Sequence, residues 1–268
     1  MEETISQIPS GGVTSPKGFC AGAVAAGIKK RVPGALDLAV LSAGKPVTAA
    51  ALFTRNKVKA APVIVSQQRL VSGKACGVVV NSGCANASSG ETAIRDAATM
   101  ADQAASCLGL EPDCMLVAST GVIGHCLPMD RIEAGLSKIK LSSTGGNDFA
   151  RAIMTTDTVP KEVGVKVGYY TIGGCGKGSG MIHPDMATML VFLTTDVPVE
   201  ASFLKQALKK AADVSFNMLT IDGDTSTNDS LFMFSSGEAG GETITAGSPG
   251  AETFQQALDY VCIHLAKA

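Results

Sequence analysis

The fold is decided by one stretch of the sequence, Lys177-Gly-Ser-Gly-Met-Ile-His-Pro-Asp-Met-Ala-Thr188-Met-Leu-Val-Phe-Leu193. Its first half is predicted to be a loop, because five glycines crowd positions 173–180 and Pro184 follows them. Its second half, from Met189 to Leu193, is a short apolar run typical of a buried strand. Thr188 lies at the joint, directly after the small residue Ala187. A threonine at the mouth of a buried strand, approached by flexible glycine backbone, is a candidate nucleophile.

Thr188 needs a base that takes its hydroxyl proton. Its own α-amino group can serve if the Ala187–Thr188 peptide bond is cut. A free α-amine has a pKa of about 7.7–8.0, so a neutral fraction exists near pH 7, whereas a lysine side chain titrates near about 10.4. The plain structural interpretation is a strand threonine whose hydroxyl bonds to the backbone, and for an arbitrary threonine this interpretation is the commoner one.

The stretch from Lys177 to Leu193 resembles the self-cleavage signature of the ornithine acetyltransferase (glutamate N-acetyltransferase) family. Six further segments match that family in order along the chain: Gly12-Val-Thr-Ser-Pro-Lys-Gly18, Phe53-Thr-Arg-Asn56, Asn81-Ser-Gly-Cys-Ala-Asn-Ala87, Ser119-Thr-Gly-Val-Ile-Gly124, Thr155-Thr-Asp157 and Asp222-Gly-Asp-Thr-Ser-Thr-Asn-Asp229. Ordered matches through most of the chain are far more specific than any single motif.

The resemblance implies an α/β (α+β) protein, a layered αββα-type sandwich similar to N-terminal-nucleophile-like (DmpA-ArgJ-like) folds. It implies a precursor in which the Thr188 hydroxyl attacks the Ala187 carbonyl, an N-to-O acyl shift forms an ester, and hydrolysis frees Thr188. The expected products are an α chain 1–187 and a β chain from 188, assembled as an α2β2 heterotetramer. Residues 1–268 are expected to form the acyltransferase core without the C-terminal region that family members carry.

The implied activity is that of a cytoplasmic acyltransferase of arginine biosynthesis. It moves acetyl from N2-acetyl-L-ornithine to L-glutamate through an acetyl-Thr188 intermediate. No cofactor is implied, and acetyl-CoA, which some relatives use to acetylate glutamate, is left open as a co-substrate. Two alternatives stay open: a self-processing threonine amidohydrolase or peptidase of the same fold, and an unprocessed, non-catalytic binding domain.

Acyl transfer also requires donors for the tetrahedral oxyanion. The resemblance assigns this role to Thr120 and Gly121, in a loop expected to follow a strand. A cation at Lys177 could bind the α-carboxylate of an amino-acid substrate, and the resemblance places either Thr155 or Thr156 in the same pocket. The ordinary interpretations are a turn and a solvated loop lysine. Five more polar residues either orient the pocket or form Asx-turns: Asn81, Asn86, Asp222, Asp224 and Asn228.

Composition excludes several other classes. The chain has 268 residues, 46% of them hydrophobic, which is enough for a sizeable core. A net charge of −2 without a basic stripe argues against nucleic acid, and no apolar run reaches the roughly 20 residues of a membrane helix. The eight cysteines form no C-x-x-C pair and are expected to be buried reduced thiols. With only three dispersed histidines, no metal site is expected.

Periodicity and turn residues predict alternating short strands and helices. The expected strands are 22–28, 36–42, 48–53, 63–65, 76–80, 115–119, 163–167, 169–172, 189–193, 217–221 and 231–234. The expected helices are 91–108, 128–138, 148–154, 199–213 and 254–268. Pattern alone does not choose between parallel and antiparallel pairing.

Overall fold

The computed structural model describes residues 4–29, 32–179, 189–219, 222 and 224–268. In these ranges the strands are β1 (Ile5–Gln7), β2 (Cys20–Val24), β3 (Leu38–Phe53), β4 (Lys74–Cys84), β5 (Met115–Val122), β6 (Lys161–Val167), β7 (Tyr170–Lys177), β8 (Leu190–Thr195) and β9 (Ser230–Ser235). The α-helices are α1 (Ala61–Arg69), α2 (Gly90–Cys107), α3 (Met129–Leu136), α4 (Gly146–Ile153), α5 (Ala201–Asp213) and α6 (Ala251–Lys267). No helix in these ranges is both long enough and apolar enough to cross a bilayer.

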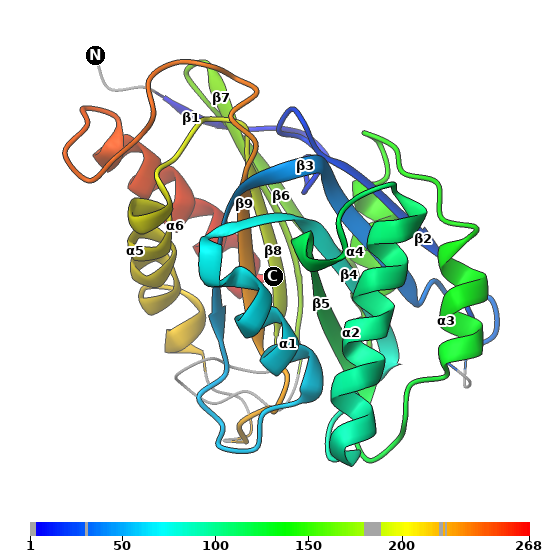
Figure 1. Ribbon diagram of the computed structural model, residues 1–268. Helices are drawn as coiled ribbons and strands as arrows, with labels where there is room; N and C mark the ends of the chain where they lie inside the picture. Colours follow the sequence, from blue (N-terminus) through cyan, green and yellow to red (C-terminus); the bar gives the residue numbers. More distant parts are fainter. Residues whose placement is uncertain (1–3, 30–31, 180–188, 220–221, 223) are drawn as a thin grey trace.

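The described strands form one hydrogen-bonded sheet in the order β1-β6-β7-β8-β9-β3-β4-β5, with β2 also beside β3 (Figure 1). The long strand β3 joins its two halves. Residues 38–42 of β3 pair with β2 and β4, whereas residues 48–53 pair with β9, and the register with β4 shifts between Ser42 and Val47. An irregularity of this kind bends a strand. The sheet therefore divides into a β2-β3-β4-β5 half and a β1-β6-β7-β8-β9 half.

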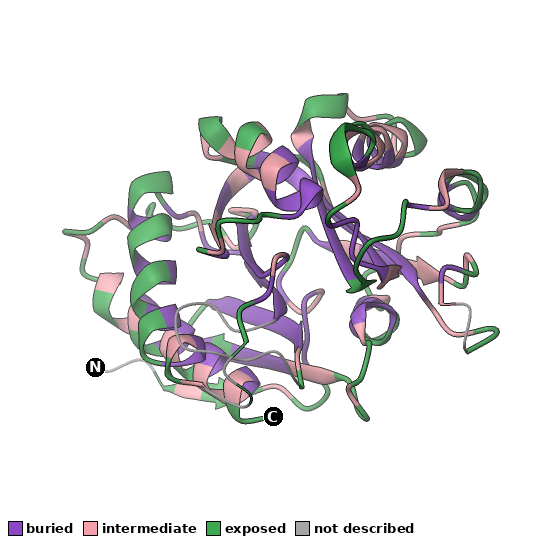
Figure 2. Ribbon diagram, turned by 90° about the horizontal axis from the view of Figure 1, so that it is seen from below, coloured by how far each residue is buried: buried purple, intermediate pink, exposed green. Residues whose placement is uncertain are grey.

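Side-chain alternation along the strands builds three hydrophobic layers. In β8, Phe192 faces the core between the two sheet halves, where its ring stacks on Phe232 at 5.5 Å. Its neighbours Val191 and Leu193 face the opposite way, into the core under α5 and α6. A third core lies between the β3-β4-β5 half and α1, α2 and α3. Figure 2 shows buried strands between helices whose outer sides are exposed. The predicted αββα sandwich is confirmed.

Parallel and antiparallel pairs both occur, which sequence pattern had left open. β4–β5 and β8–β9 are parallel, and the other pairs are antiparallel. A parallel pair needs a crossover connection, and α2 and α5 supply the two crossovers. The end of β7, the starts of β8 and β9 and the ends of β4 and β5 carry the polar residues described below.

Three local predictions are wrong for identifiable reasons. Residues 63–65, expected as a strand, lie in α1, whose first turn contains Pro62, a residue suited to that position. The strand predicted to reach residue 28 ends at Val24, because the next free N–H groups donate to the Asp37 carboxylate rather than to a strand. Part of the strand predicted at 217–221 is a 3-10 turn, Phe216–Met218, which follows the end of α5.

The glycines expected in a loop before Thr188 lie largely in β7, which reaches Lys177. Close packing explains them. A Cβ on Gly173 would lie 2.1 Å from the carbonyl oxygen of Gly12, and one on Gly174 would lie 2.6 Å from a methyl group of Leu193. These glycines admit neighbouring chain rather than provide a flexible loop.

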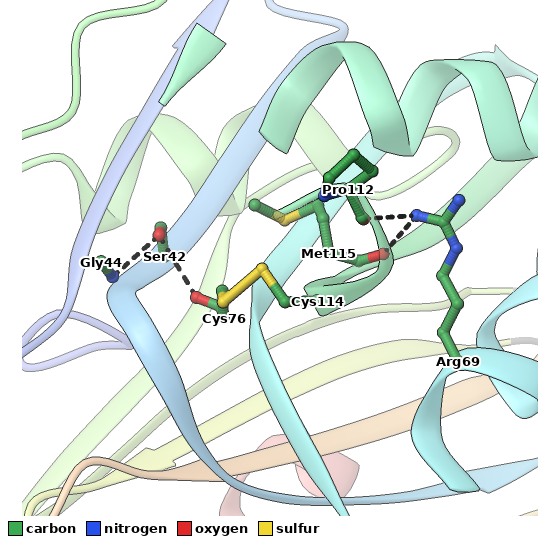
Figure 3. The surroundings of a disulfide bond; sticks show 7 residues. All are labelled: Ser42, Gly44, Arg69, Cys76, Pro112, Cys114 and Met115. Atoms are coloured by element: carbon green, nitrogen blue, oxygen red, sulfur yellow. Dashed lines mark hydrogen bonds between the residues drawn. A yellow bond between two sulfur atoms is a disulfide. The ribbon is translucent and has the colours of Figure 1, made fainter. Parts of the chain in front are cut away.

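The expectation of reduced thiols is wrong for one pair. Cys76 and Cys114 form a disulfide, with Cα atoms 5.1 Å apart (Figure 3). The two strands β4 and β5 pair with Gly77 opposite Met115, so the residues that precede this pair are neighbours. The other six cysteines are free, and Cys107 and Cys126 among them are exposed.

Candidate active site

The described part of the site is built around the backbone of Met189, the residue that follows Thr188 in the sequence. The predicted cleavage pair, Ala187 and Thr188, lies outside the described residues. The Met189 N–H donates to Oδ1 of Asp229 at 3.2 Å, and the Ser230 N–H donates to the Met189 carbonyl at 3.1 Å. On the other side, the next residue, Leu190, pairs with Lys177 of β7. The start of β8 is therefore held between Asp229 and the end of β7.

Asp229 and Lys177 are two buried ionisable groups beside this point, 1% and 5% exposed. Burial raises the pKa of Asp229 to about 8, against the opposing effects of the Ser226 side chain, the Met189 N–H and the Lys177 charge. Burial lowers the pKa of Lys177, although Asp157 and Asp229 partly oppose the shift. Near pH 7 the Asp229 carboxyl is therefore mostly neutral, and the Lys177 cation has little water around it.

Asp157 ties the segment that contains Thr155 and Thr156 to the end of β7. Burial disfavours its charge, but the Gly178 N–H at 2.8 Å and the Lys161 ammonium at 3.1 Å together hold the pKa of Asp157 below its usual value. The Thr155 N–H donates to Oδ2 of the same carboxylate at 3.4 Å. The Thr156 hydroxyl is 2.5 Å from the Ser179 hydroxyl. Both threonines are exposed, and the contacts of Asp157 and Thr156 link their segment to Gly178 and Ser179.

Thr120 and Gly121 lie in β5 itself, not in a loop after it as predicted. Gly121 pairs with Gly83 of β4 with a φ of +132°, and its hypothetical Cβ would be 2.4 Å from the Gly83 carbonyl carbon. Only glycine suits this conformation and this spacing. The register is irregular here, since Cys84 lies opposite both Thr120 and Val122. Irregularities of this kind are frequent next to active sites, where they re-aim a side chain or end the strand pairing.

Asn228 connects the end of β5, which contains Thr120 and Gly121, to Asp229 and the start of β8. Its side-chain Nδ2 donates to the carbonyl of Ala85 at 2.7 Å and to the carbonyl of Ser119 at 2.9 Å. Ser119 precedes Thr120, and Asn228 precedes Asp229, which holds Met189. The structure thus brings the predicted oxyanion residues and the start of β8 to one place.

The other flagged polar residues have simpler roles. Asn81 and Asn86 donate to the carbonyls of Cys84 and Ala93, and so shape the segment between β4 and α2. Asp222 and Asp224 are exposed, and the Asp224 N–H lies 3.5 Å from the Asp222 carboxylate, as in an Asx-turn. The contact of Asp229 with Met189 was not predicted from the sequence. The one indication was the position of this carboxylate directly before a buried apolar strand, β9.

Solved structures place the fold in a known class. An aminopeptidase from Ochrobactrum anthropi, described as a new variant among the Ntn hydrolase fold, superposes with a TM-score of 0.60 over 98% of this chain and 86% of that chain. At 15% identity this likeness shows the fold alone. The class is therefore that of proteins with an Ntn-hydrolase-type αββα sandwich.

Sequence comparison then gives the family. The model of the ArgJ family matches residues 20–268, and the chain belongs to this family. The arginine biosynthesis bifunctional protein ArgJ of Dehalococcoides mccartyi is 52% identical over 272 residues, which cover 100% of this chain and 67% of that protein. The corresponding protein of Symbiobacterium thermophilum is 51% identical, over 96% of this chain and 66% of that protein. The chain thus spans about two thirds of the length of these relatives.

Two solved structures also support membership of the ArgJ family. The ArgJ structure from Bacillus halodurans has a TM-score of 0.65 and 39% identity, covering 71% of this chain and all of that chain. The ornithine acetyltransferase of Mycobacterium tuberculosis, complexed with ornithine, has a TM-score of 0.63 and 39% identity, covering 70% of this chain and all of that chain.

Proposed function

We propose that this protein transfers acetyl from N2-acetyl-L-ornithine to L-glutamate through an acetyl-Thr188 intermediate. Membership of the ArgJ family carries this proposal, with 52% identity to a bifunctional protein of arginine biosynthesis. A 39%-identical ornithine acetyltransferase that was solved with ornithine supports the choice of donor.

The first step is self-cleavage. The Thr188 hydroxyl attacks the Ala187 carbonyl carbon, the C–N bond breaks, and the nitrogen takes up a proton as the ester forms. Water then hydrolyses the ester and leaves a free α-amine on Thr188. A cut at this point would leave a first fragment of 187 of the 268 residues, and the whole chains of the two solved relatives match a similar share of this chain, 70–71%.

Two acyl transfers follow. The α-amine takes the hydroxyl proton of Thr188, whose oxygen attacks the acetyl carbonyl of the donor; the C–N bond breaks and ornithine leaves with the proton. The glutamate amine then attacks the ester and regenerates the threonine hydroxyl. In each transfer the Thr120 hydroxyl and the Gly121 N–H donate to the tetrahedral oxyanion. The acetyl group stays on the protein between transfers, so no resident cofactor is required, and acetyl-CoA is a second donor to be tested.

Lys177 is proposed to hold the α-carboxylate that donor and acceptor share. A buried lysine whose pKa is lowered by desolvation gains from a carboxylate partner, which favours its charged form. Thr155 and Thr156 are proposed as hydroxyl donors to the same substrate. Each is replaced by valine in turn, and the threonine whose loss raises KM is the one that binds the substrate.

The test follows acetyl release from N2-acetyl-L-ornithine with and without L-glutamate. The proposal predicts that acetyl release depends on glutamate and is accompanied by formation of N-acetylglutamate. Thr188→Ala should show neither acetyl release nor N-acetylglutamate. Release that is indifferent to glutamate would indicate a hydrolase. Normal transfer by Thr188→Ala would refute the proposal. The same proposal includes a cytoplasmic location and an α2β2 assembly, and native mass measurement checks the assembly.

A further inference from the structure

Asn228 and Asp229 are consecutive residues that enter β9, and their side chains reach two different parts of the molecule. Asn228 donates to the carbonyls of Ala85 and Ser119, at the ends of β4 and β5. Asp229 accepts the N–H of Met189, at the start of β8. The two residues are 7% and 1% exposed, so neither contact is weakened by water.

The distance between the end of β5 and the start of β8 is not fixed by a direct strand pairing; the Asn228 and Asp229 contacts connect these two places. β5 and β8 belong to different halves of the sheet, with β9, β3 and β4 between them in strand order. β9 is already held by complete pairings with β3 and β8. The Asn228 amide adds a link from the start of β9 to the end of β5, and this link does not follow the sheet.

We propose that Asn228 and Asp229 are positioning residues that hold Thr120 and Gly121 of β5 at a fixed distance from the start of β8. The proposal rests on the proposed function, in which the oxyanion donors and the nucleophile come from these two places. Asn228 acts through Ser119 on the oxyanion donors, and Asp229 acts through Met189 on the residue before it.

The two residues have separable chemistry. Asp229→Asn keeps an oxygen that accepts the Met189 N–H, and the pKa of about 8 makes the native carboxyl mostly neutral near pH 7, so the amide is a close replacement. Asp229→Ala removes the acceptor. Asn228→Ala removes the donor to Ser119, and Asn228→Leu removes it while keeping the branched shape and the number of heavy atoms of the side chain. A misplacement of about 1 Å in an active site costs about 10²-fold in rate.

A buried carboxylate at the opposite end of β8 is a matched control. Asp196 follows Thr195, is buried, and accepts the N–H groups of Thr171 at 2.7 Å and Lys17 at 3.0 Å. It is about 20 Å from Met189, given the rise of a strand. Asp196→Ala loses the same kind of contact away from the proposed chemistry.

The experiment measures self-cleavage by intact mass over time, kcat and KM for transfer, and the thermal midpoint of each variant. Asn228→Ala, Asn228→Leu and Asp229→Ala are expected to lower kcat by about 10²-fold with little change in KM. Asp229→Asn is expected to restore most of the rate, and Asp196→Ala to lower the thermal midpoint with kcat unchanged. Asn228→Ala is expected to add little to Thr120→Ala, because the two changes disturb the same donors.

Wild-type kcat in folded Asn228→Leu and Asp229→Ala would overturn the proposal. An equal loss of kcat in Asp196→Ala would also overturn it, because the rate would then follow stability alone. An Asp229→Asn variant as slow as Asp229→Ala would overturn it as well. Thr188→Ala separates this outcome from a failure of the proposed function: an inactive Thr188→Ala beside fully active Asn228 and Asp229 variants would remove only the positioning role.

Discussion

Gly121→Ala tests whether the close approach of β5 to β4 sets the rate of acyl transfer. The new Cβ would lie 2.4 Å from the Gly83 carbonyl carbon and 2.6 Å from the Cys84 nitrogen, where ordinary contact begins at 3.4 Å. Both neighbours are backbone atoms, so the strands must separate by about 1.0 Å at this point. A displacement of about 1 Å costs about 10²-fold, which corresponds to about 2.7 kcal/mol of transition-state stabilisation.

The assay compares kcat for transfer from N2-acetyl-L-ornithine to L-glutamate in Gly121→Ala and in a control, Gly109→Ala. Gly109 also has a positive φ, +66°, but nothing lies within 4 Å of its hypothetical Cβ. The control bears the backbone strain, roughly 1–2 kcal/mol, without displacing a strand. We expect Gly121→Ala to lose about 10²-fold in kcat and Gly109→Ala to keep the wild-type value. A folded Gly121→Ala enzyme with wild-type kcat would refute this reasoning.

Three further predictions concern single groups. Thr120→Ala should lower kcat by about 10²–10³-fold with little change in thermal midpoint, and a wild-type rate would remove its hydroxyl from the oxyanion role. Burial raises the pKa of Asp229 from 3.8 to about 8, so its contribution to stability is full below pH 3.8 and is lost as the pH rises to about 8. Between pH 5 and 7, urea unfolding should show wild type losing about 1.4 kcal/mol per pH unit relative to Asp229→Asn, and parallel curves would contradict the assignment. Cys114→Ser removes a crosslink between residues 38 positions apart and should lower the free energy of unfolding by about 4 kcal/mol without reductant, whereas wild type in dithiothreitol should match the variant.

Regular periodicity made the β6–β7 hairpin and five of the described α-helices, α2 to α6, predictable, whereas α1 was expected as a strand. The alanine-rich spacing of 91–108 corresponds to α2, and Gly168 joins β6 to β7 as expected. The buried strand predicted from 189–193 is β8, and its alternation fixes which core each side chain enters. These elements are decided by local pattern, which a sequence displays directly.

The features that were missed depend on contacts between distant segments. Gly173 is a glycine because Gly12 passes over it, and Cys76 meets Cys114 only because β4 and β5 pair in one register. The role of Asp229 depends on its burial beside Met189, 40 residues away in sequence. Thr120 and Gly121 were found by resemblance, but their place inside a strand required the pairing with β4.

The most direct measurement is peptide mapping by mass spectrometry of the wild-type protein after exposure to N2-acetyl-L-ornithine alone. A fragment that begins at Thr188 and carries one acetyl group on the threonine hydroxyl is the predicted result, and addition of L-glutamate should remove that acetyl group as N-acetylglutamate. Turnover by a protein whose Ala187–Thr188 bond is intact, or a transferable acetyl group on a different residue, would contradict the assignment of Thr188 as the nucleophile.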